Sequence, residues 1–139
     1  TGCLNGYNMW NFKHKNSYIM ILFNICNAED IAEQKGQNEC DNAIRDFAQI
    51  LKVEFLHDSV YRLNASKFSV IGNNRPDEVC KRHIKNVEDA LESYNSIRMS
   101  YKLRVVYNYG RFEAKTDVNI DGLYSRLFSG LHKKSLETL

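Results

Sequence analysis

The stretch RLNASKFSVIG, residues 62–72, decides how the chain is interpreted. Its first half is preceded by Val60 and contains Leu63, and residues 68–71 form a second apolar run. The four residues between these runs, Asn64-Ala65-Ser66-Lys67, are of turn type. Two short β-rich runs separated by turn residues are typical of a β-hairpin. We therefore predict a hairpin over residues 62–72 with its turn at residues 64–67.

Hydrophobic periodicity predicts the elements around this hairpin. Residues 18–25 are almost continuously apolar, as expected of a strand that is covered on both faces. A short helix should run from a cap at Asn27 to Gly36, and a second helix should span residues 38–52. Residues 75–77, Arg-Pro-Asp, should begin a long helix because proline suits a first helical turn. The apolar stripe of that helix comprises Val79, Ile84, Val87, Ala90, Leu91, Tyr94 and Ile97.

The last third of the chain should add a strand and a helix. Alternating apolar residues predict a strand over residues 101–114. A helix should follow, with Asn119 as a possible cap and with LHKKSLETL, residues 131–139, after its end. The order β-α-α-β-β-α-β-α predicts an α+β sandwich, a central and mainly antiparallel sheet with helices packed on it. The stripe of the last helix comprises Ile120, Leu123, Tyr124, Leu127, Phe128 and Leu131.

The composition favours one globular domain. A chain of 139 residues with 43% hydrophobic content can bury one core, so we expect a single domain over residues 1–139. There is no initiator methionine, which suggests a domain cut from a longer protein. The net charge of +2 gives no electrostatic reason to expect a nucleic acid or a membrane surface as a partner. No apolar run has the length of a membrane-spanning helix, although the parent protein could carry an anchor.

The cysteines and histidines indicate no metal chemistry. Cys3, Cys26, Cys40 and Cys80 are scattered, without a C-x-x-C pair or a histidine at ligand spacing. We predict reduced thiols in a cytoplasmic protein, with no metal and no cofactor. The isolated histidines are interpreted as surface or packing residues; they are His14, His57, His83 and His132.

Residues 62–72 resemble the GGDEF hairpin of diguanylate cyclases, which reads R-[YL]-G-G-[DE]-E-F before an apolar strand. Arg62, Leu63 and Phe68 match this pattern. Other segments follow in the family's order and spacing, so the resemblance covers nearly the whole chain. It implies a GGDEF domain with the nucleotidyl-cyclase palm-like, ferredoxin-like fold. These segments are TGCLNG at residues 1–6, the run at residues 18–52, VVYNYG at residues 105–110 and DGLYSRLFSG at residues 121–130.

The resemblance also implies a degenerate catalytic site. Family members join two GTP molecules with divalent metals, which need carboxylate ligands. The two acids that hold these metals align with Asn24 and Ser66, which are both neutral. The next hairpin acid aligns with Lys67, whose charge would repel Mg²⁺. Asn64 and Ala65 replace the two glycines that let the backbone approach phosphates.

The nucleotide contacts that the resemblance implies are mostly lost as well. Ala32 replaces the asparagine that reads guanine, while Asp41 keeps the other guanine contact. Leu127 and Leu131 align with the lysine and arginine that hold phosphates. Weak residual nucleotide binding would then rest on Asp41 and on Lys67. The alternative is that Asp41 is an ordinary carboxylate on a helix face.

The family's product-binding motif R-x-x-D aligns with residues 55–58. Asp58 matches, but Phe55 stands in place of the arginine, so the phosphate fork is missing. We expect no primary c-di-GMP binding here and interpret Asp58 as a turn residue at the entry to a strand.

Three functions remain open. The favoured one is a catalytically inactive GGDEF-like module of a bacterial c-di-GMP signalling protein, acting through contacts with an attached domain, such as an EAL phosphodiesterase, or with a homodimer partner. The second is a nucleotide sensor that binds GTP without turnover. The third is weak nucleotide hydrolysis. The last two need phosphate contacts, and among the aligned positions only Lys67 supplies one.

Overall fold

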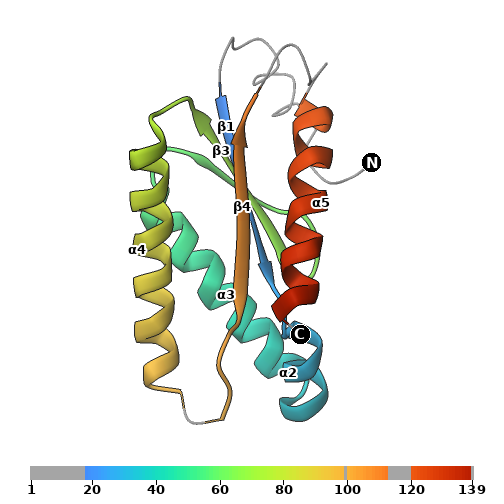
Figure 1. The fold of residues 1–139 in the computed structure, drawn as a ribbon. Coiled ribbons are helices and arrows are strands. Elements are labelled where there is room, and N and C mark those ends of the chain that lie inside the picture. The colour runs from blue at the N-terminus through green and yellow to red at the C-terminus, as the bar shows by residue number, and fades with distance from the viewer. Residues whose placement is uncertain (1–17, 99, 113–119, 139) are drawn as a thin grey trace.

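The computed structural model describes residues 18–98, 100–112 and 120–138 (Figure 1). These residues form the element order β-α-α-β-β-α-β-α, as the sequence predicted. The elements are β1 (Tyr18–Ile25), α2 (Ala28–Lys35), α3 (Gln37–Glu54), β2 (Ser59–Arg62), β3 (Lys67–Asn73), α4 (Asp77–Ser96), β4 (Val105–Arg111) and α5 (Ile120–Thr138).

The four strands form one sheet in the order β2-β3-β1-β4, and every neighbouring pair is antiparallel. Figure 1 views the sheet towards the edge at β4, with α3 and α4 on one side and α5 on the other. All eight residues of β1 are buried, because helices cover both faces of this central strand. The predicted α+β sandwich with an antiparallel sheet is confirmed.

The two faces of the sheet carry separate hydrophobic cores. On one face, Phe23 of β1 and Phe68 of β3 both lie against Phe47 of α3, with ring centroids 5.9 and 5.7 Å apart. On the other face, Met20 and Leu22 of β1 pack with α5. Burying a phenylalanine side chain stabilises a fold by roughly 1.5–3 kcal/mol, so these rings hold α3 to the sheet.

The strand β4 begins later than the predicted residue 101, and hydrogen bonds of a side chain explain the difference. The Asn95 amide accepts from the Leu103 N–H at 2.9 Å and donates to the Leu103 carbonyl at 3.0 Å. Both main-chain groups of Leu103 are therefore hydrogen-bonded to Asn95, so they are not free to pair with a neighbouring strand. The predicted extension over residues 113–114 lies outside the described residues.

The ends of the helices differ from the predictions in four details. Asn27 precedes α2, but its side chain binds the Lys102 carbonyl and the Arg104 N–H and makes no cap. The helix α4 begins at Asp77, so Pro76 lies just before the helix and not in its first turn.

The prediction that LHKKSLETL, residues 131–139, follows the last helix is wrong, because α5 continues through Thr138. The helix α3, with bounds Gln37–Glu54, is slightly longer than predicted. Gly36 ends α2 as expected, at φ +94°. The predicted cap Asn119 lies outside the described residues.

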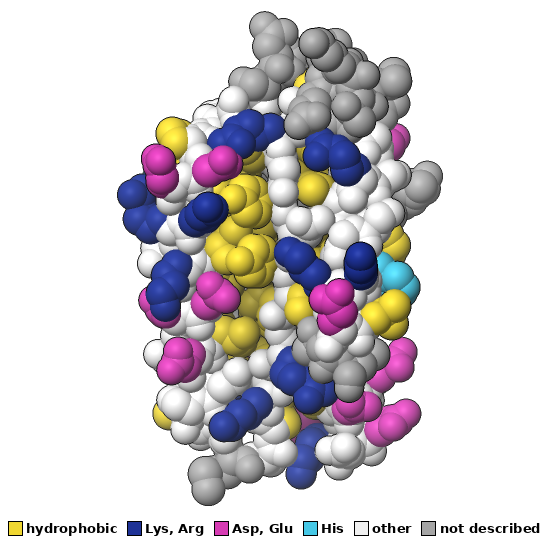
Figure 2. All heavy atoms as spheres, viewed as in Figure 1, with side chains coloured by type: hydrophobic (Ala, Val, Ile, Leu, Met, Phe, Trp, Pro, Cys, Tyr) yellow, Lys and Arg dark blue, Asp and Glu magenta, His cyan; other side chains and the backbone are white. Residues whose placement is uncertain are grey.

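The outer edge of β4 is partly covered by α5. Figure 2 shows hydrophobic side chains between α4 and β4. Tyr107 and Tyr109 of β4 are half-buried against the core. Lys134 donates to the Tyr107 carbonyl at 2.8 Å, and Arg126 donates to the Arg111 carbonyl at 2.9 Å. Occupied carbonyls and charged side chains hinder the addition of another strand to a sheet edge.

Among the described residues, no helix has the length and apolar character that crossing a membrane requires.

Candidate functional site

The hairpin predicted from the sequence is present, and Asn64 shapes its turn. β2 ends at Arg62 and β3 begins at Lys67, so Lys67 belongs to the strand as its first residue. The Asn64 side-chain oxygen accepts from the N–H groups of Ser66 and Lys67, at 3.0 and 3.1 Å. Asparagine favours turns because its side chain can bind the backbone a few residues on. The Arg62 guanidinium adds bonds to the carbonyls of Asn64 and Ala65.

The two positions aligned with metal ligands, Asn24 and Ser66, lie side by side next to this turn. The Ser66 hydroxyl donates to Asn24 Oδ1 at 2.9 Å, and Asn24 Nδ2 donates to the Ser135 hydroxyl at 2.8 Å. Ser135 in turn donates to the Leu131 carbonyl at 3.0 Å. The sequence analysis missed Ser135 because it placed this residue after the last helix. The C-terminal half of α5 therefore reaches the rim of the hairpin.

We call Asn24, Ser66 and Ser135 the neutral network. Asn24 is only 7% exposed, and the network uses both its amide oxygen and its amide nitrogen. Divalent cations such as Mg²⁺ favour anionic oxygen ligands, and these three side chains supply none. Among the described residues, no three His, Cys, Asp or Glu side chains gather into a group that could hold a metal ion.

Lys67 points towards α5. Its Nζ lies 5.4 Å from the centroid of the Phe128 ring, which is close enough for a cation–π interaction. Phe128 continues an aromatic row along α5, with Tyr124 on one side at 5.7 Å and His132 on the other at 6.4 Å. The structure thus gives Lys67 a partner within the fold.

Asp41 lies on the opposite face of the sheet, in a cleft between α3 and β2. The cleft has a volume of about 410 Å³, and Gln37 donates to the Asp41 carboxylate at 2.9 Å. Successive residues of a strand point to opposite faces, so Phe68 lines this cleft while Lys67 does not. The structure does not bring Asp41 and Lys67 together, and their nucleotide binding stays a prediction. The lining residues are Asp41, Ile44, Arg45, Ala48, Lys52, Val60, Arg62 and Phe68.

Three cations line the α3–β2 cleft, two of which the sequence analysis missed. Arg45 and Lys52 come from α3, and Arg62 comes from β2. Lys52 has no hydrogen-bond or ion-pair partner among the described residues. With Asp41 as the single acid, the cleft favours an anion. The spacing of Asp41, Arg45 and Lys52 along one helix face was a signal available in the sequence.

Among the residues aligned with the product-binding motif, Asp58 forms an ion pair with Arg75. Asp58 lies just before β2, as predicted, and both its oxygens bind Arg75, at 2.6 and 2.9 Å. The hydrogen bond to Asp58 raises the pKa of Arg75 further above its ordinary value. A Cβ atom at Gly72 would overlap this pair, so a side chain there would displace the ends of Asp58 and Arg75. Phe55 is buried and faces His83, with ring centroids 5.1 Å apart.

The remaining aligned positions serve packing. Leu127 and Leu131 of α5 are buried against β1, and Ala32 of α2 packs at the edge of the core on the other face. Cys26, Cys40 and Cys80 are free thiols, and burial raises the pKa of Cys40 and of Cys80, which keeps both in the protonated form. Cys3 and His14 lie outside the described residues.

An antiparallel sheet with helices on both faces and a hairpin at its rim defines a palm-like α+β domain. GGDEF domains of known structure have this fold. The active GGEEF domain of a diguanylate cyclase from Vibrio cholerae superposes with a TM-score of 0.78 at 16% identity, over 94% of this chain and 90% of that chain. The GGDEF domain of DgcB from Caulobacter crescentus, in complex with c-di-GMP, gives 0.75 at 13% identity, over 87% and 73%.

An EAL/GGDEF domain protein from M. capsulatus gives a TM-score of 0.73 at 15% identity, over 87% of this chain and 79% of that chain. No family model and no curated protein sequence matches the chain. At these identities, the likeness shows that the chain has the GGDEF fold, which is the fold that the sequence resemblance implied.

Proposed function

We propose that this chain is a catalytically inactive GGDEF-like module of a bacterial c-di-GMP-type signalling protein. Its role is to contact other domains of its parent protein or a second copy of itself. The observation that carries the proposal is the neutral network, because it joins the two positions that the resemblance assigns to metal ligands.

The physical argument is one of charge. Transfer between phosphates needs metal ions that neutralise the triphosphate, and such ions need carboxylates. Asn24 and Ser66 offer neutral oxygens, and each already spends hydrogen-bonding groups on the other. Each interaction made only in the transition state typically contributes a few kcal/mol, so the loss of several leaves no measurable rate.

The structural neighbours support the signalling context. One is an EAL/GGDEF domain protein, and an EAL neighbour is the arrangement we propose for the parent of residues 1–139. The free thiols at Cys26, Cys40 and Cys80 support a cytoplasmic location, where thiols are kept reduced.

The test is incubation of the purified chain with GTP and Mg²⁺ or Mn²⁺, followed by mass spectrometry for c-di-GMP. We expect no product above a protein-free control. A matched variant, Asn24→Asp with Ser66→Asp, asks whether acids at these two positions alone restore chemistry; we expect that they do not, because the guanine and phosphate contacts are also replaced. Product formed by the unaltered chain in proportion to its concentration would refute the proposal.

The α3–β2 cleft favours a second candidate function, a sensor of an anionic nucleotide. Arg45, Lys52 and Arg62 provide the phosphate-binding charge that the aligned positions lack. Titration calorimetry with GTP, with and without Mg²⁺, separates the two candidates. The module should bind no tighter than millimolar. Micromolar binding that is lost in Lys52→Ala but kept in Lys67→Ala would favour the sensor and place the phosphates in the cleft.

A further inference from the structure

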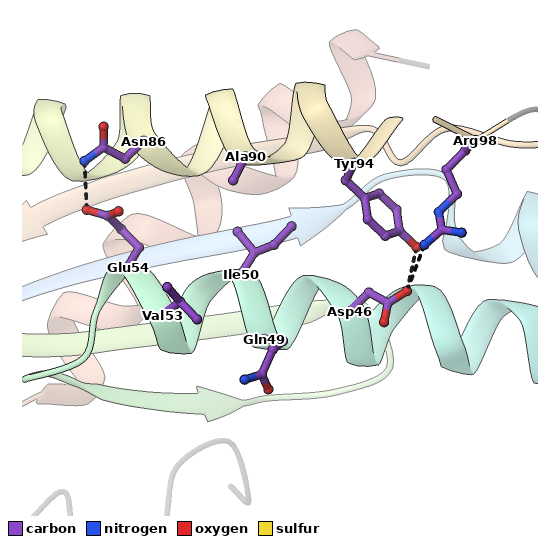
Figure 3. Close-up of a pocket in the computed structure, with 9 residues that line it drawn as sticks. All are labelled: Asp46, Gln49, Ile50, Val53, Glu54, Asn86, Ala90, Tyr94 and Arg98. Carbon is purple, nitrogen blue, oxygen red and sulfur yellow. Dashed lines mark hydrogen bonds and ion pairs between the residues drawn. The ribbon is translucent and has the colours of Figure 1, made fainter. Parts of the chain in front are cut away.

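A groove of about 450 Å³ runs between α3 and α4 on their outer side, away from the sheet (Figure 3). Ile50 of α3 and Ala90 of α4 point towards each other across its middle and make the floor apolar. Neither the neutral network nor the α3–β2 cleft shares this surface. We call it the α3–α4 groove.

The two ends of the α3–α4 groove carry different polar groups. At one end, Asp46 accepts from the Tyr94 hydroxyl at 2.9 Å and from Arg98 at 3.4 Å, and Arg98 lies 4.1 Å above the Tyr94 ring. At the other end, Glu54 Oε2 accepts from Asn86 at 3.1 Å and lies 2.7 Å from His83 Nδ1. Eight residues separate the two acids, which is about 12 Å along a helix.

Each end keeps unused hydrogen-bonding capacity. Within the described residues, Arg98 bonds to Asp46 through Nη2 alone, so its Nη1 remains a donor at this end. The bonds of Glu54 all go to Oε2, which leaves Oε1 as an acceptor at the other end. A donor at one end and an acceptor at the other would pair if the groove met itself in the reverse direction.

Exposed hydrophobic side chains border both ends. Four large hydrophobic side chains are strongly exposed among the described residues: Val53 at 69%, Leu56 at 74%, Ile97 at 75% and Leu136 at 57%. Val53 lines the groove at the Glu54 end, and Leu56 follows in the turn after α3. Ile97 comes seven residues after Ala90, so it continues the same stripe of α4 to the Arg98 end. Exposed apolar residues that gather on one face mark an interaction surface.

We propose that the α3–α4 groove is a self-association surface and that its occupant is the same groove of a second copy of this chain. A two-fold axis that crosses the groove at its middle reverses its direction, so each end meets the opposite end of the partner. The Arg98 end then faces the Glu54 end, and the exposed Ile97 lies near the exposed Val53 and Leu56 of the other copy. In this arrangement, the same surface pairs its charged groups and buries its exposed apolar side chains.

This inference deepens the proposed function, because it names the surface through which the module would make its contacts. It rests on that proposal only for the statement that the contact serves signalling. The pairing itself follows from the α3–α4 groove and would stand if the chain proved to be an enzyme.

The test is sedimentation velocity of the full 139-residue chain from micromolar to millimolar concentration. We expect a reversible dimer. Ile97→Lys and Val53→Glu should each weaken it by roughly a hundredfold, because every symmetric dimer contains the altered contact twice and a buried apolar contact contributes about a factor of ten. Leu136→Lys is the matched control: it charges an exposed leucine away from the groove and should leave the dissociation constant unchanged.

Mixing provides the test that is specific to the two-fold arrangement. In an equimolar mixture of Ile97→Lys and Val53→Glu chains, one pair of ends becomes oppositely charged and the other pair stays apolar. The mixture should therefore dimerise more tightly than either variant alone. Circular dichroism and thermal melts confirm that all three variants remain folded.

Three results would overturn the surface: a monomer at every concentration, equal weakening by Leu136→Lys, or no recovery in the mixture. Assaying the same samples for c-di-GMP keeps the two proposals apart. A monomer that makes no product refutes only the self-association surface. A dimer that makes product refutes only the catalytic proposal.

Discussion

The two sides of strand β3 differ in what their polar side chains do. On the α5 side, Asn24, Ser66 and Ser135 bond to one another, and Lys67 lies over Phe128, so the polar groups are used within the fold. On the α3 side, a cleft of about 410 Å³ stays open and carries three cations. The contrast shows that the two faces of one strand can differ: internal hydrogen bonds use the polar groups on one face, while charged side chains line an open cleft on the other.

The largest effect should come from the ion pair between Arg75 and Asp58. Breaking a buried ion pair by removing one partner typically costs 3–5 kcal/mol, so Arg75→Ala should lower the free energy of unfolding by about that amount. Both side chains are shielded, with Arg75 16% and Asp58 7% exposed. Urea denaturation measures the change.

Lys85→Ala is the control for Arg75→Ala. It removes an exposed ion pair with Asp89, where both side chains are more than half exposed, and should leave stability nearly unchanged. If Arg75→Ala lowered the free energy of unfolding as little as Lys85→Ala, the shielded ion pair of Arg75 with Asp58 would contribute no more than an exposed pair.

The neutral network should give a smaller loss. Asn24→Ala leaves the hydroxyls of Ser66 and Ser135 without their shared partner, and an unsatisfied buried polar group costs about 1–3 kcal/mol. Ser135→Ala removes one hydrogen bond and should cost only about 0.5–1.5 kcal/mol. Thermal and chemical denaturation of both variants would test this order. The reverse order would mean that Ser135 holds α5 through contacts other than Asn24.

Several features of the fold could be predicted from the sequence because they depend on local pattern. The almost continuous apolar run of residues 18–25 marked β1, and the Asn64 turn marked the hairpin, since both signals lie within a few residues. Leu103 shows where this reasoning ends. It fits a strand by alternation, but Asn95, eight positions earlier, takes both its main-chain groups. No periodicity reveals that competition.

The candidate site was harder to predict for the same reason. The alignment placed Asn24 and Ser66 together, but Ser135 reaches them from 111 residues beyond Asn24, across the sheet. The pair of Arg75 with Asp58 likewise joins a loop to a turn, which only the packing of the chain determines. The separation of Lys67 from the cleft could have been predicted, because Phe68 beside it begins the apolar run of residues 68–71 and neighbouring residues of a strand point to opposite faces.

The α3–β2 cleft should respond to anions with an effect below that of the neutral network. A ligand that binds only the folded state stabilises it by RT ln(1 + [L]/Kd), which is about 1 kcal/mol when the ligand is at roughly five times its Kd. Inorganic phosphate at tens of millimolar should therefore raise the melting temperature modestly. Lys52→Ala should remove most of this gain, whereas Lys133→Ala on α5 should not. Equal loss in both would show screening of the whole surface and no site in the cleft.

The smallest effect should come from Lys67, and it decides which side of β3 this residue serves. Lys67→Met keeps the apolar stem and removes the charge above Phe128, which should cost about 0.5–1 kcal/mol of stability for a partly exposed cation–π contact. Phe128→Leu should cost at least as much, and combining the two substitutions should cost less than their sum, because both remove the same interaction. Urea denaturation of the two single variants and the double variant closes this cycle. GTP affinity, measured on the same proteins, should not change in Lys67→Met, since Lys67 faces away from the cleft that holds Arg45 and Lys52. Additive stability changes together with a weaker affinity for GTP would show that Lys67 does not interact with Phe128 and contributes to GTP binding. The two faces of β3 would then not differ in the way described.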